Sequence, residues 1–266
     1  MMFKIVKIGI CLILIIDASI SAVNAQAHAN EDSSKSNWKT WGGASLELSL
    51  SKKVDFSLGY LHSENLQDSL KNSFNQGSAG LGYNFSKHFS VKGGFIITQF
   101  PSSANSTYRY FLRGSYKVGL GDKMNWTNGI QGEKHSANEN RFDYRIIFIT
   151  QFGLRKRLEF LGLSPSVSYW LYYNVGGSKI QYYDISGQPS VKATPDGVHR
   201  GRLILNMSSK INQMLSVSLY YIRQNEFNLF STDRGLNVVK PSTGKITRPF
   251  SNYNVLGMSL KFNVDL

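Results

Sequence analysis

Hydrophobic and polar residues alternate between Thr107 and Gly119. The even positions of this segment carry mostly aromatic and aliphatic side chains, whereas the odd positions include Arg109, Arg113 and Lys117. Because successive side chains of a β-strand point to opposite faces, this period of two predicts a strand with one apolar and one cationic face. An α-helix would scatter both sets around its surface, so the pattern favours a strand.

The alternation recurs from Trp38 onward in segments of about 10 to 14 residues, close to the length that a tilted membrane strand needs. We predict eleven strands, near residues 38–51, 54–66, 74–85, 88–100, 107–119, 123–134, 141–154, 165–175, 199–210, 214–226 and 252–265. No segment between them has the pattern of an amphipathic helix of three turns, and no linker divides the chain. A single all-β domain over residues 38–266 is therefore expected.

The connections between the predicted strands alternate in length. Tight turns are expected at residues 52–53, 86–87, 121–122 and 212–213, with a somewhat longer turn at 155–162. Between them lie longer connections around residues 65–73, 101–106, 135–140, 176–198 and 228–251. Short turns at one end and long loops at the other are the plan of outer-membrane β-barrels, in which the short turns are periplasmic.

The predicted number of strands conflicts with this plan, because bacterial single-chain barrels usually have an even number. A further strand within residues 176–198 or 228–251 would resolve the conflict. We therefore predict a single antiparallel up-and-down transmembrane β-barrel of about twelve strands, with ten as the alternative. The remaining option is that the polar N-terminal segment threads the lumen.

The first 25 residues have the pattern of a secretory signal peptide. Lys4 and Lys7 precede an apolar run from Ile8 to Ile16, and Val23-Asn24-Ala25 fits a cleavage site. A spanning helix needs about 20 apolar residues, and Asp17 interrupts this run. Export, cleavage and a final location in the outer membrane are therefore predicted, because a membrane protein without helices must be a closed barrel.

Residues 26–37 are polar and are predicted to form a flexible lead-in to the barrel. The single cysteine, Cys11, lies within the predicted signal peptide. The mature chain would then contain no cysteine, which excludes disulfide bonds, thiolate metal sites and cysteine nucleophiles.

The chain is strongly basic, with 30 Lys and Arg against 17 Asp and Glu and a formal net charge of +13. Such an excess suits nucleic acid, an anionic membrane surface or anionic solutes. The sequence has no helix-turn-helix, zinc-finger spacing or clustered basic run, so nucleic acid is not an expected partner. The cations instead recur at alternate strand positions.

Four motifs stand out along the chain, Asn37-Trp38-Lys39-Thr40-Trp41-Gly42, residues 85–94, Tyr108-Arg109-Tyr110 and Arg141-Phe142-Asp143-Tyr144-Arg145. They resemble those of uncharacterised outer-membrane β-barrels catalogued as domain of unknown function number 2490. The resemblance covers most of residues 38–266. It implies an outer-membrane barrel inserted by the barrel-assembly machinery, and it brings no established activity.

Three groups of residues are candidates for a catalytic site. His88 and Ser90 have the spacing of a lipid A deacylase-like pair, but they lie beside a predicted periplasmic turn. His62-Ser63 and His135-Ser136 are adjacent pairs, whose side chains point to opposite faces of a strand. An omptin-like protease would draw on Glu133, His135 and Glu139, which flank a loop where polar residues are expected anyway. No catalytic site is predicted.

Metal and cofactor sites are not predicted either. The remaining histidines, His28 and His199, stand apart from other ligands, and Asp184, Asp196 and Asp233 are single loop carboxylates without calcium-loop spacing. The three loop carboxylates are expected to be solvated.

The inward-facing charges are the most informative feature of the sequence. The predicted lumen cations are Arg109, Arg113, Lys117, Arg141, Arg145, Arg200 and Arg202, and the predicted counter-charges are Glu47, Asp55, Glu133 and Asp143. They would either pack a narrow lumen through ion pairs or form an anion-selective passage or a pocket for an acidic ligand.

The predicted function is accordingly structural, or that of a narrow anion-leaning pore, without enzymatic activity. The expected partners are outer-membrane lipid and a small anionic solute. Two alternatives remain open, an outer-membrane lipid or peptide hydrolase and a secreted soluble β-sandwich binding protein.

Overall fold

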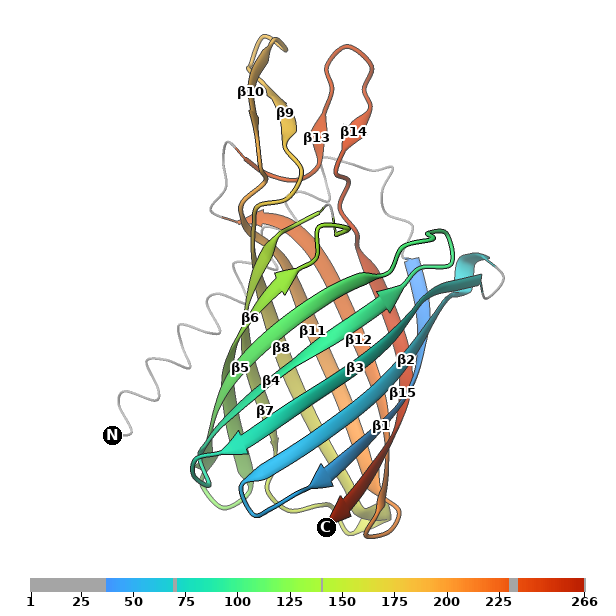
Figure 1. Cartoon of the computed structure of the whole chain (residues 1–266), viewed down its shortest axis with the longest axis vertical. Helices are drawn as coiled ribbons and strands as arrows, with labels where there is room; N and C mark the ends of the chain where they lie inside the picture. Colours follow the sequence, from blue (N-terminus) through green and yellow to red (C-terminus); the bar gives the residue numbers. More distant parts are fainter. Residues whose placement is uncertain (1–36, 69–70, 140, 230–233, 266) are drawn as a thin grey trace.

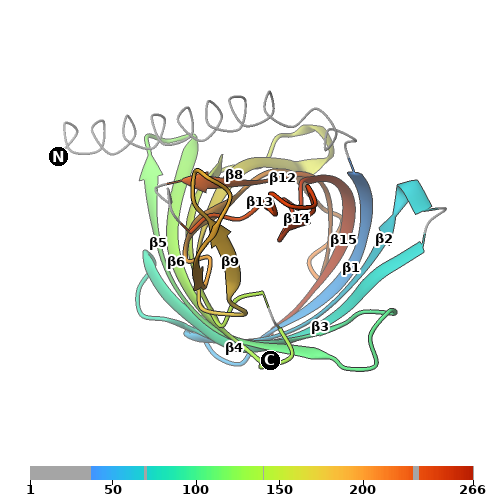
Figure 2. The same ribbon diagram turned by 90° about the horizontal axis from the view of Figure 1, so that it is seen from above.

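A single β-sheet closes on itself as a barrel (Figure 1, Figure 2). The computed structural model describes residues 37–68, 71–139, 141–229 and 234–265. The predicted signal peptide and all of the predicted lead-in except Asn37 lie outside the described residues, as does any threading of the lumen by that segment.

Within the described residues, eleven strands form the closed sheet. They are β1 (Asn37–Ser49), β2 (Val54–Asn65), β3 (Lys71–Asn84), β4 (Phe89–Gln99), β5 (Thr107–Leu120), β6 (Met124–His135), β7 (Tyr144–Leu154), β8 (Leu163–Val175), β11 (Gly197–Lys210), β12 (Leu215–Leu229) and β15 (Tyr253–Asp265). Two 3₁₀ helices, η2 (Leu66–Asp68) and η3 (Phe160–Gly162), lie in the connections. No helix of the described chain is long and apolar enough to cross a membrane.

The barrel closes through a parallel pair of strands. Neighbours along the chain pair antiparallel, but β1 and β15 pair parallel from Asn37 opposite Tyr253 to Ser49 opposite Asp265. An odd number of up-and-down strands requires one such pair, because the first and last strands then run in the same direction. The prediction of an all-β barrel of about twelve strands is confirmed, with eleven strands in the sheet and one pair that is not antiparallel.

The segments in which a twelfth strand was expected form small hairpins outside the barrel. β9 (Ile180–Tyr183) pairs with β10 (Pro189–Ala193), and β13 (Val238–Val239) pairs with β14 (Ile246–Thr247). Both stand above the barrel at the end that carries the long connections, and the C-terminal end of β15 lies at the opposite end with the short turns (Figure 1). The predicted sorting of connections by length is therefore confirmed.

The two hairpins share a small hydrophobic core. Ile180, Tyr182 and Ala193 are buried together, and Val238 packs against them. The Tyr182 hydroxyl also donates a 3.2 Å hydrogen bond to the carbonyl of Gly235. We refer to β9, β10, β13 and β14 with their turns as the tower. Its β9 strand stands over the side of the mouth away from β1 and β2 (Figure 2).

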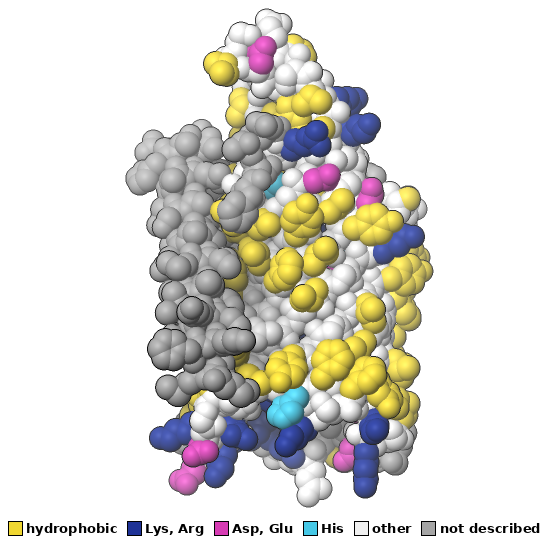
Figure 3. Space-filling view, turned by 90° about the vertical axis from the view of Figure 1, so that its left-hand side faces the viewer, with side chains coloured by type: hydrophobic (Ala, Val, Ile, Leu, Met, Phe, Trp, Pro, Cys, Tyr) yellow, Lys and Arg dark blue, Asp and Glu magenta, His cyan; other side chains and the backbone are white. Residues whose placement is uncertain are grey.

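The two faces of the sheet meet different surroundings. On β5, Tyr110 and Leu112 point outward and each is 62% exposed, whereas Arg109 and Arg113 point into the barrel. On the face of the barrel shown in Figure 3, hydrophobic side chains are spread along the outer wall, and the charged side chains lie toward its two ends. Among the described residues the apolar outer faces of the strands pack against no second sheet, and the barrel sheet closes on itself, which excludes the β-sandwich alternative.

Candidate functional site in the barrel interior

The barrel encloses a cavity of about 560 Å³ toward the end that carries the long connections. Its basic lining residues are Lys39, Lys92, Arg109, Arg113, Arg141, Arg145, Arg200 and Arg202, and its acidic lining residues are Glu133 and Glu139. The described part of the lining thus carries a large excess of positive charge.

One group of these cations is paired with Glu133, which lies on β6. Arg145 stands directly opposite Glu133 in the β6–β7 ladder, and its guanidinium approaches the carboxylate at 3.5 Å. Arg109 on β5 lies 4.0 Å away, His135 lies 3.2 Å away, and the Gln131 amide donates a 2.6 Å hydrogen bond. The side chain of Glu133 is only 3% exposed. Such a buried carboxylate needs these partners to offset its desolvation.

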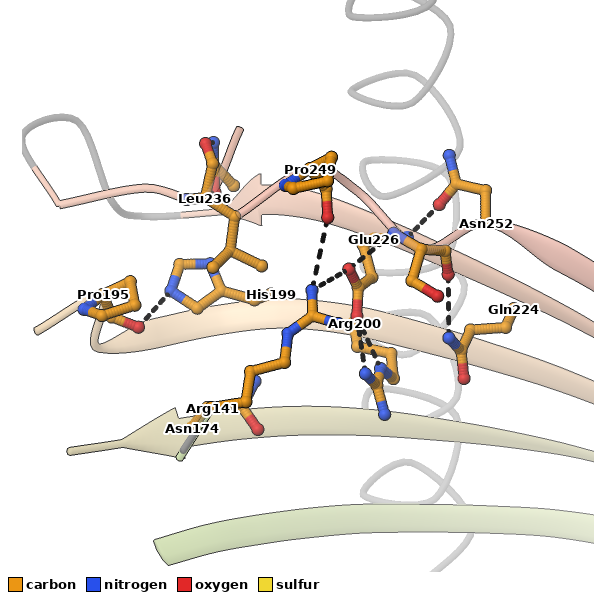
Figure 4. A network of polar contacts seen from close by, with 12 residues as sticks. Arg141, Asn174, Pro195, His199, Arg200, Gln224, Glu226, Leu236, Pro249 and Asn252 are labelled. Carbon is orange, nitrogen blue, oxygen red and sulfur yellow. Dashed lines mark hydrogen bonds and ion pairs between the residues drawn. The ribbon is translucent and has the colours of Figure 1, made fainter. Parts of the chain in front are cut away.

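A second group surrounds Glu226 on β12 (Figure 4). Arg200, opposite it in the β11–β12 ladder, donates two hydrogen bonds to one carboxylate oxygen, at 2.6 and 3.1 Å. Arg141 donates to the other oxygen at 2.6 Å, and the backbone N–H of Ser251 donates to it at 2.8 Å. The Asn252 amide oxygen accepts from the backbone N–H of Glu226 at 2.6 Å. Both oxygens of the Glu226 carboxylate thus accept hydrogen bonds from specific donors.

The other four lining cations have no carboxylate partner among the described residues. Arg202 and Arg113 each donate to the amide oxygen of a glutamine, at 2.6 and 2.7 Å. Lys39 and Lys92 likewise form no ion pair within the described chain. Half of the cavity's basic residues therefore form an ion pair with a glutamate, two arginines for each carboxylate, and the other half form none.

Aromatic rings on β8 hold the guanidiniums in place. Three of them lie 5.4–5.5 Å from the ring centroid of Tyr172, and they belong to Arg145, Arg200 and Arg202. Arg113 lies 5.1 Å from the ring of Trp170. A cation over an aromatic face is attracted by the ring quadrupole, and this attraction lets several guanidiniums share one region without a carboxylate for each.

Six of the seven predicted cations line the cavity, and Lys117 does not. Lys117 lies near the end of β5, is exposed, and adjoins the short-turn end of the barrel. Of the predicted counter-charges, Glu133 is in the cavity. Glu47 pairs with Lys261 at 2.5 Å, and Asp55 accepts a 2.8 Å hydrogen bond from an asparagine, both outside the cavity lining. Asp143 is exposed in the connection before β7.

The three candidate catalytic groups lie at different places in the barrel. His62 shares the outer face with Tyr60 and contacts Asn75 at 2.6 Å, whereas Ser63 points the other way and is fully buried. A ring nitrogen of His88 lies 2.9 Å from the backbone carbonyl of Lys117, so this ring is held by the neighbouring strand. Glu133 and His135 do come together, within the arginine group described above. No group of three metal-ligating residues occurs in the described chain.

Several residues of the site were not singled out by sequence reasoning. They are Lys39, Lys92, Trp170, Tyr172 and Glu226. Glu226 follows Ile222 and Gln224 at inward positions of β12, so strict alternation carried to the end of the strand would have found it. The face to which Trp170 and Tyr172 point becomes evident only when the register of β8 is known.

No protein-family model matches the chain, and no curated protein sequence matches it. The resemblance to the catalogued outer-membrane barrels stays a prediction.

Proposed function

We propose that this chain is an outer-membrane β-barrel whose basic lumen admits small anions. The observation that carries the proposal is the division of a closed sheet into an outer face with exposed hydrophobic side chains and an inner face with unneutralised cations. In this proposal the outer face meets lipid after export through a cleaved signal peptide and insertion by the barrel-assembly machinery.

The dimensions of the barrel support a membrane setting. Its strands contain from 11 to 15 residues, and a tilted membrane strand needs about 9 to 11. Exposed aromatic residues cluster near the short-turn end, where Tyr83, Phe85 and Phe89 pack at centroid distances of 4.7 and 5.5 Å. Amphipathic aromatic rings favour the boundary between lipid and water.

The charge distribution supports passage of anions rather than cations. The Glu133 and Glu226 groups pack the wall and are each surrounded by two arginines. The unpaired cations then leave a positive potential in the lumen, which raises the local concentration of anions. With about eight strands side chains fill a barrel, and with about sixteen it holds a wide channel, so eleven strands suit a narrow passage.

Two experiments on the wild-type protein test the membrane setting. The folded protein should be recovered in the outer-membrane fraction, and its migration on gels should change when the sample is boiled in detergent. Recovery of the mature protein as a soluble periplasmic species would overturn the proposal.

Planar-bilayer recordings test the anion preference. In a salt gradient, the reversal potential of the wild-type protein should indicate a preference for chloride, and Arg113→Glu should reduce it. Lys117→Glu makes the same change in charge outside the cavity and should reduce the preference less. The absence of ohmic conductance in wild-type protein would favour a lumen that is only packed.

One contact bears on the hydrolase alternative. His135 and Glu133 lie 3.2 Å apart, as a base and its orienting carboxylate would. Both oxygens of Glu133 already accept from other side chains, however, so we assign the pair to packing of the wall. Lipid or peptide cleavage by the purified protein that is lost in His135→Gln would establish the alternative instead.

A further inference from the structure

Two of the unpaired cations meet at the seam where the barrel closes. Lys39 on β1 lies with its ammonium 4.8 Å from the ring centroid of Tyr253, which begins β15. Arg202 on β11 donates a 3.1 Å hydrogen bond to the hydroxyl of Tyr253, and its guanidinium lies 5.7 Å from the ring of Trp41. We call Lys39, Trp41, Arg202 and Tyr253 the seam cluster.

The seam cluster contains buried hydrogen-bond donors that have no acceptor among the described residues. The indole N–H of Trp41 and the Nε of Arg202 are both buried, and neither has an acceptor among the described residues. Buried donors in proteins are normally paired. The known acceptors of Arg202 are neutral, Gln224 and Tyr253, so its charge is also unmatched. An anion with several acceptor oxygens, such as a carboxylate, would supply both the missing acceptors and the missing negative charge.

An apolar aromatic wall adjoins these donors. The ring of Trp41 packs edge-on against Phe74 at 5.8 Å, and Phe74 packs against Phe100 at 6.3 Å. Leu61 and Ile96 line the same cavity beside them. Chloride or phosphate would contact only the cations. A ligand that uses both the cations and this wall has a carboxylate and a flat apolar body.

The seam cluster also lies near the mouth of the barrel. Lys39 is close to the start of β1 and Tyr253 is the first residue of β15, so both lie at the end with the long connections. The β9 strand of the tower stands over the side of the mouth away from β1, and β13 and β14 stand between β9 and β15 (Figure 2). A solute that enters from this end therefore meets the seam cluster early.

From these contacts we infer that the seam cluster is a binding site for aromatic carboxylates. The carboxylate lies between Lys39 and Arg202 and accepts from the indole N–H of Trp41, and the ring packs along Phe74. The inference rests on the proposed function, because the anion must enter a water-accessible lumen. It adds to that function a class of preferred solute.

Calorimetric titration of the full-length protein in detergent tests the site, with benzoate as the probe. Benzoate should bind about tenfold more tightly than acetate, which has the charge without the ring. It should also bind about tenfold more tightly than benzyl alcohol, which has the ring without the charge. Equal affinity for benzoate and acetate would overturn the inference, and so would equal affinity for benzoate and benzyl alcohol.

Variants locate the site. Arg202→Gln and Lys39→Gln should each weaken benzoate binding about tenfold, whereas Lys117→Gln, which removes a charge outside the cavity, should leave it unchanged. Heat-modifiable migration verifies that each variant is folded, and either seam variant alone suffices for the test. Unchanged benzoate affinity in a folded seam variant would overturn the inference.

The two proposals fail separately. If the protein conducts chloride selectively but does not distinguish benzoate from acetate, the seam inference is wrong and the pore stands. If it binds benzoate through the seam cluster but shows no conductance, the pore is wrong and the interior is a binding pocket that opens only at the mouth.

Discussion

Arg141, in the connection between β6 and β7, donates a 2.6 Å hydrogen bond to the carboxylate of Glu226 on β12. The same carboxylate binds Arg200 on the neighbouring strand and accepts from the backbone of Ser251, which lies between β14 and β15 (Figure 4). One buried side chain thus fastens two long connections to the barrel wall. We therefore assign Glu226 a structural role at the mouth.

Glu226→Gln should destabilise the barrel strongly. The substitution keeps the shape of the side chain but leaves Arg141 and Arg200 without a counter-charge, in a place where the glutamate side chain is 1% exposed. Removing one partner of a buried ion pair costs about 3–5 kcal/mol. The measurement is the free energy of unfolding in urea, with the folded fraction read from heat-modifiable migration on gels.

Glu47→Gln is the matched control for this prediction. Glu47 and Lys261 form an ion pair whose side chains are 39% and 42% exposed. Exposed pairs contribute about 0–1 kcal/mol because water screens them, so this variant should unfold close to the wild type. Equal destabilisation by the two substitutions would contradict a special role for Glu226.

Gly257→Ala should weaken the closing seam. A Cβ atom at Gly257 would overlap the ring of Tyr220, which lies directly over this glycine. The ring would have to move, and overpacking of this kind costs about 1–3 kcal/mol. Gly42→Ala is the control on the partner strand, because a Cβ there meets nothing within 4 Å. The same urea titration should therefore separate the two alanine variants, and equal stability would show that Tyr220 can move aside freely.

The local pattern predicted the strands well because alternation is a local property. The observed strands begin and end within a few residues of the predicted positions, and the outward set on β5 is exposed as expected. The eleven predicted segments correspond to the eleven strands of the sheet, and the preference for twelve came only from the even number that is usual in bacterial barrels. The parallel pairing of β1 with β15 accommodates the odd number, and the alternation within one strand does not show which strand it will pair with.

The sequence predicted which side chains face the barrel interior, but not how far along the barrel axis each one lies. Lys117 shares a strand with Arg113 and Arg109, yet it is exposed near the short-turn end, because alternation says nothing about position along the barrel axis. Arg141 was assigned to a strand, but it lies in a loop and reaches Glu226 from there. Whether a cation pairs with a carboxylate depends on the register between neighbouring strands. The sequence of a single strand does not determine that register.

Asn228→Ala should loosen the base of the tower. The Asn228 amide donates to the backbone carbonyl of Leu236 at 3.0 Å and accepts from its N–H at 2.7 Å, and the Leu236 side chain is buried. Without these bonds, the segment that carries β13 and β14 should open more often. Limited trypsin digestion of the folded protein should then cleave faster after Lys240 and Lys245, which are exposed.

The control for this digestion is Asn138→Ala. Asn138 lies in a different long connection and donates a single 3.3 Å hydrogen bond to the Ser106 carbonyl. It should leave cleavage after the two tower lysines unchanged. If both variants accelerate that cleavage equally, the bonds to Leu236 do not hold the tower in place.

The tower should also respond to alkaline pH through Tyr182. Its burial in the hairpin core, together with the nearby Asp196 carboxylate, raises the pKa of this phenol from 10.0 to about 12. Below pH 10 the hydroxyl is protonated in both the folded and the unfolded tower, so its contribution is constant. As the pH rises from 10 to 12 the unfolded form loses the proton first, and the stability of the tower falls.

Tyr182→Phe isolates this titration, because it keeps the ring and removes the ionisable group. The difference in tyrosinate absorbance between wild type and variant should titrate with a midpoint of about 12. A difference midpoint near 10.0 would mean that water reaches the hydroxyl. The contact between Tyr182 and Gly235 would then not hold the two hairpins together.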